Sequence, residues 1–151
     1  MSTVEAREIQ RYLPHGYPLL LVDRVTEIEE GVSGVGVKNV TADEICINGH
    51  FPGNPIMPGV LIVECMAQTA AVVFGYRRER PEDGGEGHAA NHLSARLGMI
   101  QNMKFRKPVV PGDRLTVAVR LVRRFGRTFK ISAEARVGDE VVAGGTLILA
   151  G

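Results

Sequence analysis

Apolar and polar residues alternate along much of the C-terminal third of the chain. Residues 115–121 and 129–137 place apolar side chains at every second position, and residues 141–149 form a third extended run. A period of two is typical of strands that bury one face, and the short turns between these runs suit antiparallel neighbours. Further extended patterns cover residues 19–29, 35–40 and 96–107. The pattern therefore predicts about five or six antiparallel strands.

The middle of the chain differs, because residues 60–78 are apolar on nearly every side of a helix that Pro58 would open. Such a helix in a globular protein is buried, and the strands are the element available to wrap it. A second, short helix is expected over residues 3–11. The sequence thus predicts one α+β domain over residues 1–151, with an antiparallel sheet wrapped around one long central helix. A single helix covers only part of such a sheet, so we expect pairing with a second copy.

Residues 48–59, NGHFPGNPIMPG, contain three Pro and three Gly and predict a shaped loop rather than a regular element. His50 lies in this loop, directly before the long helix. A histidine in a loop is more often a surface or hydrogen-bonded residue. In a rigid loop beside a carboxylic acid, it is instead a candidate for acid–base chemistry.

Glu64 is the one carboxyl group in the most apolar helix of the chain. Burying an unpaired carboxylate is costly, so Glu64 faces water, has a partner or stays protonated as a catalytic acid. Gln68 shares its helix face and would bond the carboxyl group, a substrate or surface water. The N–H groups of Gly59 and Val60 lack partners within the helix and are candidate donors to a substrate oxygen. The alternative is an ordinary helix start with a packing glycine.

Composition and charge exclude several functions. The chain has 151 residues, a formal net charge of +1, no Trp and 5% aromatic residues, which argues against nucleic-acid binding. Its longest apolar stretch is interrupted and too short to span a membrane. Two cysteines make no disulfide framework, so we expect a reducing, cytoplasmic location. The apolar neighbours of Cys65 predict a small core residue rather than a nucleophile. The spacing of His88 and His92 would suit a metal on a helix, but their Gly-rich surroundings argue against one.

These residues together resemble a known family. The run from His50 to Gln68, HFPGNPIMPGVLIVECMAQ, resembles the signature of the bacterial β-hydroxyacyl-acyl-carrier-protein dehydratases of fatty acid synthesis. Residues 13–25, LPHGYPLLLVDRV, resemble the first strand of that family, and residues 104–113, KFRKPVVPGD, resemble its strand and turn after the helix. The resemblance covers nearly the whole chain and is weakest over residues 79–95.

The resemblance implies the hotdog fold, in which a sheet wraps a long central helix. It implies a homodimer with shared active sites, where His50 of one subunit faces Glu64 of the other. Such dimers commonly assemble into a hexamer, as a trimer of dimers. The implied reaction is dehydration of a (3R)-3-hydroxyacyl thioester carried on acyl carrier protein, with no metal or other cofactor. His50 and Glu64 are the implied catalytic pair.

Other positions follow from the same resemblance. Substrate contacts are expected from Gly59, Val60, Gln68, Phe51 and Leu61. Related dehydratase/isomerases carry Asp at the position of Glu64, so isomerisation is not expected as the main activity. The chain departs from the family at Gly16, where relatives often have Arg, and at Arg96 and Leu97, where many have aromatic residues near the acyl tunnel.

Acyl carrier protein is acidic, so its docking is expected to use exposed cations, with residues 104–107 preferred. The candidates are Arg77, Arg78, Arg80, Lys104, Arg106, Lys107, Arg123, Arg124 and Arg127. Three other functions remain open from the residues. They are an acyl thioesterase on the same fold, a non-catalytic acyl-binding module, and a dehydratase of a polyketide or other specialised pathway.

Overall fold

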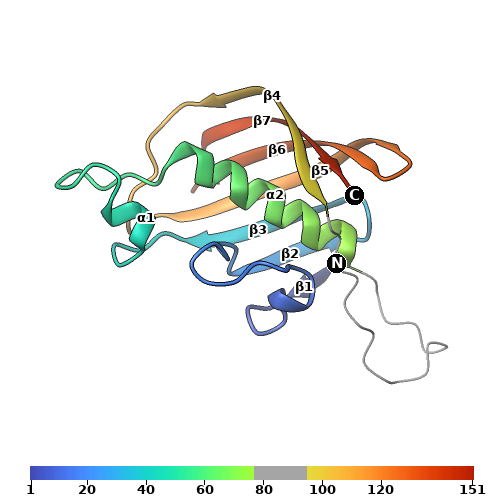
Figure 1. The fold of residues 1–151 in the computed structure, drawn as a ribbon, viewed down its shortest axis with the longest axis horizontal. Helices are drawn as coiled ribbons and strands as arrows, with labels where there is room; N and C mark the ends of the chain where they lie inside the picture. The colour runs from blue at the N-terminus through green and yellow to red at the C-terminus, as the bar shows by residue number, and fades with distance from the viewer. Residues whose placement is uncertain (77–94) are drawn as a thin grey trace.

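A seven-stranded antiparallel sheet curves around one long helix in the computed structural model, which describes residues 1–76 and 95–151 (Figure 1). The strand order across the sheet is β1-β2-β3-β5-β6-β7-β4. The strands are β1 (Ser2–Val4), β2 (Arg24–Glu29), β3 (Ser33–Asn39), β4 (Arg96–Phe105), β5 (Arg114–Phe125), β6 (Thr128–Val137) and β7 (Glu140–Ala150). The helices are η1, a 3-10 turn (Ile9–Arg11), α1 (Ile45–Asn48) and α2 (Gly59–Gly75). This is the predicted α+β hotdog fold, with seven strands in place of about five or six.

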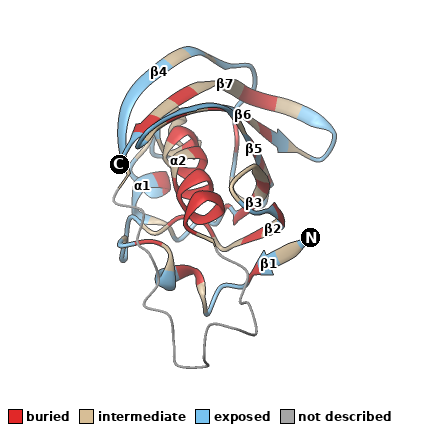
Figure 2. Cartoon of the chain, turned by 90° about the vertical axis from the view of Figure 1, so that its right-hand side faces the viewer, coloured by how far each residue is buried: buried red, intermediate tan, exposed pale blue. Residues whose placement is uncertain are grey.

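The helix α2 forms the centre of the core (Figure 2). It buries most of its side chains, among them Met66, Val72 and Val73. Each such aliphatic side chain stabilises the fold by roughly 1.5–3 kcal/mol relative to an exposed one. The helix lies unusually close to β3. A Cβ atom added at Gly36 would lie 2.1 Å from Thr69 Oγ1, and one at Gly34 would lie 2.6 Å from Val73 Cγ2.

The predicted meander is confirmed in its register. Val117 pairs with Ala135 and Val119 with Ala133, and all four side chains are buried on the face that meets α2. The intervening residues of both strands lie on the outer face of the sheet. The hydrophobic alternation therefore selected both the strands and the face that each one buries.

The predicted helix over residues 3–11 is wrong. Ser2 and Val4 pair with β2 as the strand β1, and the 3-10 turn η1 is the one helical piece of this segment. Val4, Ile9 and Leu13 are each almost completely buried. Adding a strand to the sheet edge buries Val4 and satisfies its backbone, which outweighs the local helix preference of a short segment.

Two further boundaries differ. The strand predicted over residues 19–29 begins only at Arg24, because the N–H groups of Leu21 and Val22 are bonded to the side chain of Gln68. The helix predicted over residues 60–78 begins one residue earlier and ends at Gly75, where Tyr76 adopts an extended conformation.

Several predicted features lie outside the described residues. They are the histidines His88 and His92 and the cations Arg77, Arg78 and Arg80. Among the residues that are described, no helix is both long and apolar enough to cross a membrane.

Candidate active site

His50 follows the short helix α1 and lies at the start of the proline-rich loop. Its Nδ1 atom is 2.9 Å from the carbonyl oxygen of Ile56. A carbonyl oxygen only accepts hydrogen bonds, so Nδ1 carries the hydrogen, and in the neutral imidazole Nε2 keeps its lone pair. The bond therefore orients the imidazole with its basic nitrogen available to a substrate.

Three further features shape this loop. The ring centroid of Phe51 lies 4.0 Å from that of His50. Phe51 has a φ of 57°, a left-handed conformation that costs a non-glycine residue about 1–3 kcal/mol. The N–H of Met57 donates to Val109 O at 2.7 Å and attaches the far end of the loop to the fold. The sequence predicted a loop shaped by its prolines, and the structure adds a residue in a left-handed conformation and an anchor at Met57.

Glu64 lies on α2, one turn beyond the start of the helix. Its Oε1 atom accepts a hydrogen bond from Gln68 Nε2 at 2.9 Å. The Glu64 side chain is 25% exposed, so it is neither free in water nor fully enclosed. Of the three alternatives open from the sequence, the structure shows a partnered carboxyl group.

Gln68 is 1% exposed and bonded at both ends of its amide. Its oxygen accepts from the N–H groups of Leu21 (3.0 Å) and Val22 (3.4 Å). Its nitrogen donates to Leu19 O (2.8 Å) and to Glu64. It therefore bonds the carboxyl group and is no surface residue. A direct contact between Gln68 and a substrate stays a prediction, and it would require one of these bonds to open.

His15 is the residue that the sequence-based reasoning missed. Its Nε2 atom lies 3.2 Å from Glu64 Oε1, and its side chain is 27% exposed. It stands in the loop between η1 and β2. The one signal that pointed to it was its place in residues 13–25, the segment that resembles the family's first strand, since no periodicity connects this loop to α2.

A cavity of about 300 Å³ opens beside Glu64. Its lining comprises Pro14, His15, Glu64, Ala67, Gln68, Ala71, Ala95, Arg96, Leu97 and Leu149. Apolar and small residues form most of this wall, and the carboxyl group of Glu64 is its one acid. The cavity would suit an apolar ligand beside a carboxyl group.

The other predicted site residues lie apart from this cavity. His50 and Phe51 do not line it, and neither do Val60 or Leu61. Val60 is 75% exposed on the outer side of the first helical turn, and Phe51 is also exposed. Within one chain the structure thus gathers Glu64 and Gln68 but does not bring His50 to them. The proposed contacts of Phe51, Val60 and Leu61 with an acyl chain stay a prediction.

The start of α2 offers backbone donors. Pro58 precedes the helix as its cap, and the N–H groups of Gly59 and Val60 have no hydrogen-bond partner in the described part of the chain. A Cβ atom added at Gly59 would lie 3.0 Å from the ring of Phe105. Gly59 is therefore a packing glycine as well as a candidate donor, and the two alternatives are compatible.

The two cysteines differ in environment. Cys65 is completely buried, and burial raises the pKa of its thiol to about 12. This confirms the prediction of a core residue, because a neutral thiol is a poor nucleophile. Cys46 lies exposed on α1. Within residues 1–76 and 95–151, no cluster of three or more His, Cys, Asp or Glu side chains is arranged to hold a metal ion.

Comparison with known structures supports the fold. The dehydratase heterocomplex ApeI:P from Xenorhabdus doucetiae aligns over 94% of this chain and 89% of its own, with a TM-score of 0.74 and 20% identity. A hypothetical thioesterase with coenzyme A from Streptococcus pneumoniae TIGR4 aligns over 83% and 82%, with a TM-score of 0.58 and 12% identity. At these identities the likeness establishes the fold alone.

Sequence comparison is more specific. The 3-hydroxyacyl-(acyl-carrier-protein) dehydratase FabZ of Agrobacterium fabrum is 44% identical over 143 residues, which are 95% of this chain and 86% of the relative. The enzyme of the same name from Clostridium botulinum is 45% identical over 145 residues, 96% of this chain and 94% of the relative. The family model described as the FabA-like domain matches residues 13–146. The chain therefore belongs to the FabA-like family, among the bacterial 3-hydroxyacyl-acyl-carrier-protein dehydratases.

Proposed function

We propose that this protein dehydrates (3R)-3-hydroxyacyl-acyl-carrier-protein to the trans-2-enoyl thioester in fatty acid biosynthesis. The observation that carries the proposal is Glu64, held by Gln68 at the wall of a largely apolar cavity. The names of the FabZ relatives support the same reaction. We further propose that residues 1–151 act as a single dehydratase domain in the cytoplasm.

In the proposed mechanism, His50 Nε2 removes a proton from the carbon next to the thioester carbonyl. The electron pair of the broken carbon–hydrogen bond forms the carbon–carbon double bond as the bond between carbon 3 and its hydroxyl oxygen breaks. Glu64 gives its proton to the departing oxygen, which leaves as water. The N–H of Gly59 binds the carbonyl oxygen while charge develops on it. His50 then loses its proton to solvent, and Glu64 takes up a proton from solvent, so both residues are ready for the next turnover.

The two catalytic residues require a second copy of the chain, since one chain keeps His50 outside the Glu64 cavity. The strand β4 is an edge of the sheet, and Figure 2 shows it largely exposed. An exposed edge strand with apolar side chains favours pairing with another chain. Those side chains are Leu97, Met99, Ile100 and Phe105. We therefore propose a homodimer with shared sites, and its assembly into a hexamer of three dimers.

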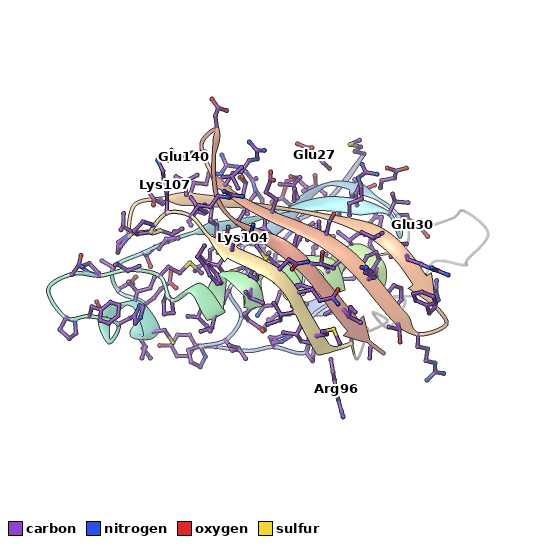
Figure 3. All side chains as sticks on the ribbon, turned by 90° about the horizontal axis from the view of Figure 1, so that it is seen from above. Glu27, Glu30, Arg96, Lys104, Lys107 and Glu140 are labelled. Carbon is purple, nitrogen blue, oxygen red and sulfur yellow. The ribbon has the colours of Figure 1, made fainter. Side chains whose placement is uncertain are left out.

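The sequence favoured residues 104–107 as the docking surface for acyl carrier protein, but we propose a different surface. Lys107 forms an ion pair with Glu140, which compensates its charge (Figure 3). The hairpin between β5 and β6 is a better candidate, because residues 121–133 include no acid. Arg123 and Arg124 lie over the rings of Phe125 and Phe129, at 4.2 and 5.0 Å from the ring centroids. Binding that weakens as salt rises would support this proposal.

The direct test follows enoyl thioester formation from a 3-hydroxybutyryl thioester by ultraviolet absorbance. Removing either half of the acid–base pair, in His50→Ala or Glu64→Gln, should lower kcat by about a hundred- to ten-thousandfold. Circular dichroism would check that both variants fold. Full activity in either variant would remove that residue from the mechanism.

Free thiol release, measured in the same samples, distinguishes the remaining functions. Hydrolysis of the thioester without enoyl formation would favour a thioesterase. The absence of both reactions, on short and long chains, would favour an acyl-binding module. A dehydratase of a specialised pathway would show the same chemistry on its own carrier protein.

A further inference from the structure

The amide of Gln68 can be oriented from its neighbours alone. Backbone N–H groups only donate, so the two that face Gln68, from Leu21 and Val22, require its oxygen at that end. The amide nitrogen must then face Leu19 O and Glu64 Oε1. The reversed amide would set N–H against N–H and oxygen against oxygen. Glu64 Oε1 is therefore an acceptor of a hydrogen bond.

His15 approaches the same oxygen atom. Its Nε2 atom is 3.2 Å from Glu64 Oε1, and its Nδ1 atom is buried with no hydrogen-bond partner among the described residues. With the hydrogen on Nε2, the nitrogen nearest the carboxyl group carries the donor, and only a lone pair is buried at Nδ1. With the hydrogen on Nδ1, it would bury an N–H group without an acceptor. The tautomer with hydrogen on Nε2 is the one that fits.

The two oxygen atoms of the Glu64 carboxyl group have different surroundings. Oε1 accepts a hydrogen bond from Gln68 and lies 3.2 Å from His15 Nε2, whereas Oε2 has no hydrogen bond to any part of the described chain. A proton on Oε1 would compete with both donors, so the transferable proton belongs on Oε2.

Resting on the proposed function, we propose that His15 is a positioning residue for dehydration. Together with Gln68 it keeps Oε1 as the accepting atom, so that the acidic hydrogen stays on Oε2 and is presented to the leaving hydroxyl. His15 does not touch the substrate carbons in this proposal. Its effect falls on the step in which the carbon–oxygen bond breaks, because that step needs the proton of Glu64.

The first test compares His15→Ala with His15→Gln, because the glutamine amide nitrogen reaches about as far as histidine Nε2 and also donates. On 3-hydroxybutyryl thioester, His15→Ala should lower kcat by about tenfold or more while KM changes by less than about twofold. His15→Gln should recover most of the loss. Arg11→Ala, an exposed change in the same N-terminal segment, serves as the control and should behave as wild type.

The second test changes the leaving group. Chloride departs without a proton, so elimination from 3-chlorobutyryl thioester should be nearly as fast in His15→Ala as in wild type, after correction for the uncatalysed reaction. Glu64→Gln should show the same selective loss. A structural role for His15 predicts equal losses on both substrates and no recovery in His15→Gln.

These results separate the two proposals. If wild-type protein forms no enoyl thioester, the proposed function fails. If wild type is active and His15→Ala matches it on the hydroxy substrate, only the role of His15 is overturned. Equal losses on the hydroxy and chloro substrates would overturn it as well.

Discussion

The loop that carries His50 and the helix face that carries Glu64 are built in opposite ways. His50 is oriented by one hydrogen bond and one ring contact in a largely exposed loop. Glu64 is held by residues from the helix and from the segment before β2, through a buried amide. The acid half is thus part of the core of its own chain. The loop that carries His50, the proposed base, is mostly exposed, which suits the proposed completion of the site by a neighbouring subunit.

The largest expected effect comes from mixing two inactive variants, which tests whether His50 and Glu64 act from different subunits. His50→Ala and Glu64→Gln chains, co-expressed with separate tags, should form mixed dimers in which one of the two sites keeps both catalytic residues. Random pairing in a two-fold dimer should restore about a quarter of wild-type activity, against almost none for each variant alone.

The matched control is a single chain that carries both substitutions, mixed with itself. If tag-purified mixed dimers were as inactive as this control, His50 and Glu64 would act within one subunit. The exposure of the His50 loop would then have no connection with a neighbouring subunit.

A second experiment compares stability between the two regions. Gln68→Leu leaves the N–H groups of Leu21 and Val22 buried without an acceptor, so the free energy of unfolding should fall by about 1–3 kcal/mol. Asn54→Ala, an exposed change in the His50 loop, should alter it by less than about 0.5 kcal/mol. Urea denaturation monitored by circular dichroism measures both. Equal losses would show that the His50 loop is as integral to the core as the Gln68 network.

A third experiment addresses the ring of Phe51. In Phe51→Ala the ring no longer restrains the His50 imidazole, and kcat should fall by about tenfold because the base is less well placed. The unfolding free energy should hardly change, since the ring is exposed. Phe51→Tyr keeps the ring and should keep the activity. A large loss of stability in Phe51→Ala would contradict this assignment.

The smallest expected effect concerns the two cysteine thiols, Cys46 just before the His50 loop and Cys65 next to Glu64. At pH 8, iodoacetamide should modify the exposed Cys46 and leave the buried Cys65 intact, with no adduct on Cys46→Ser, as read by mass spectrometry. Two adducts on the native protein would show that α2 opens.

The same burial has a consequence for alkaline stability. The pKa of Cys65 is raised from 9.0 to about 12, so the folded state keeps a proton that the unfolded chain loses. The stability from the neutral thiol is therefore complete below about pH 9 and is lost as the pH rises towards 12. Denaturation midpoints measured across this range should fall less steeply in Cys65→Ala than in wild type.

Periodicity was enough to predict the central sheet and helix, and composition was enough to predict the loop around His50. Val117 and Ala135 alternate with polar residues because one face of their strands meets α2. The strand β1 was not predictable in this way, since three residues show no period and the edge of β2 decides their conformation.

The residues that surround Glu64 were equally hard to predict from the sequence. Gln68 bonds backbone groups 46 to 49 positions away, and no local pattern indicates which distant N–H will meet a buried amide. His15 was missed for the same reason. The resemblance placed His50 and Glu64 in the site, whereas only the folded chain shows which side chains surround them.

The two glycines of β3 have a consequence for the acid that is not visible from the site. Thr69 is buried against Gly36, and its hydroxyl donates to Cys65 O, so its side chain has no room to turn away. A methyl group at position 36 would overlap the Thr69 side chain, so Thr69, β3 or the helix that also carries Glu64 would have to shift. The position of Glu64, the proposed proton donor, thus depends on close packing at the opposite face of α2, which the two glycines of β3 allow.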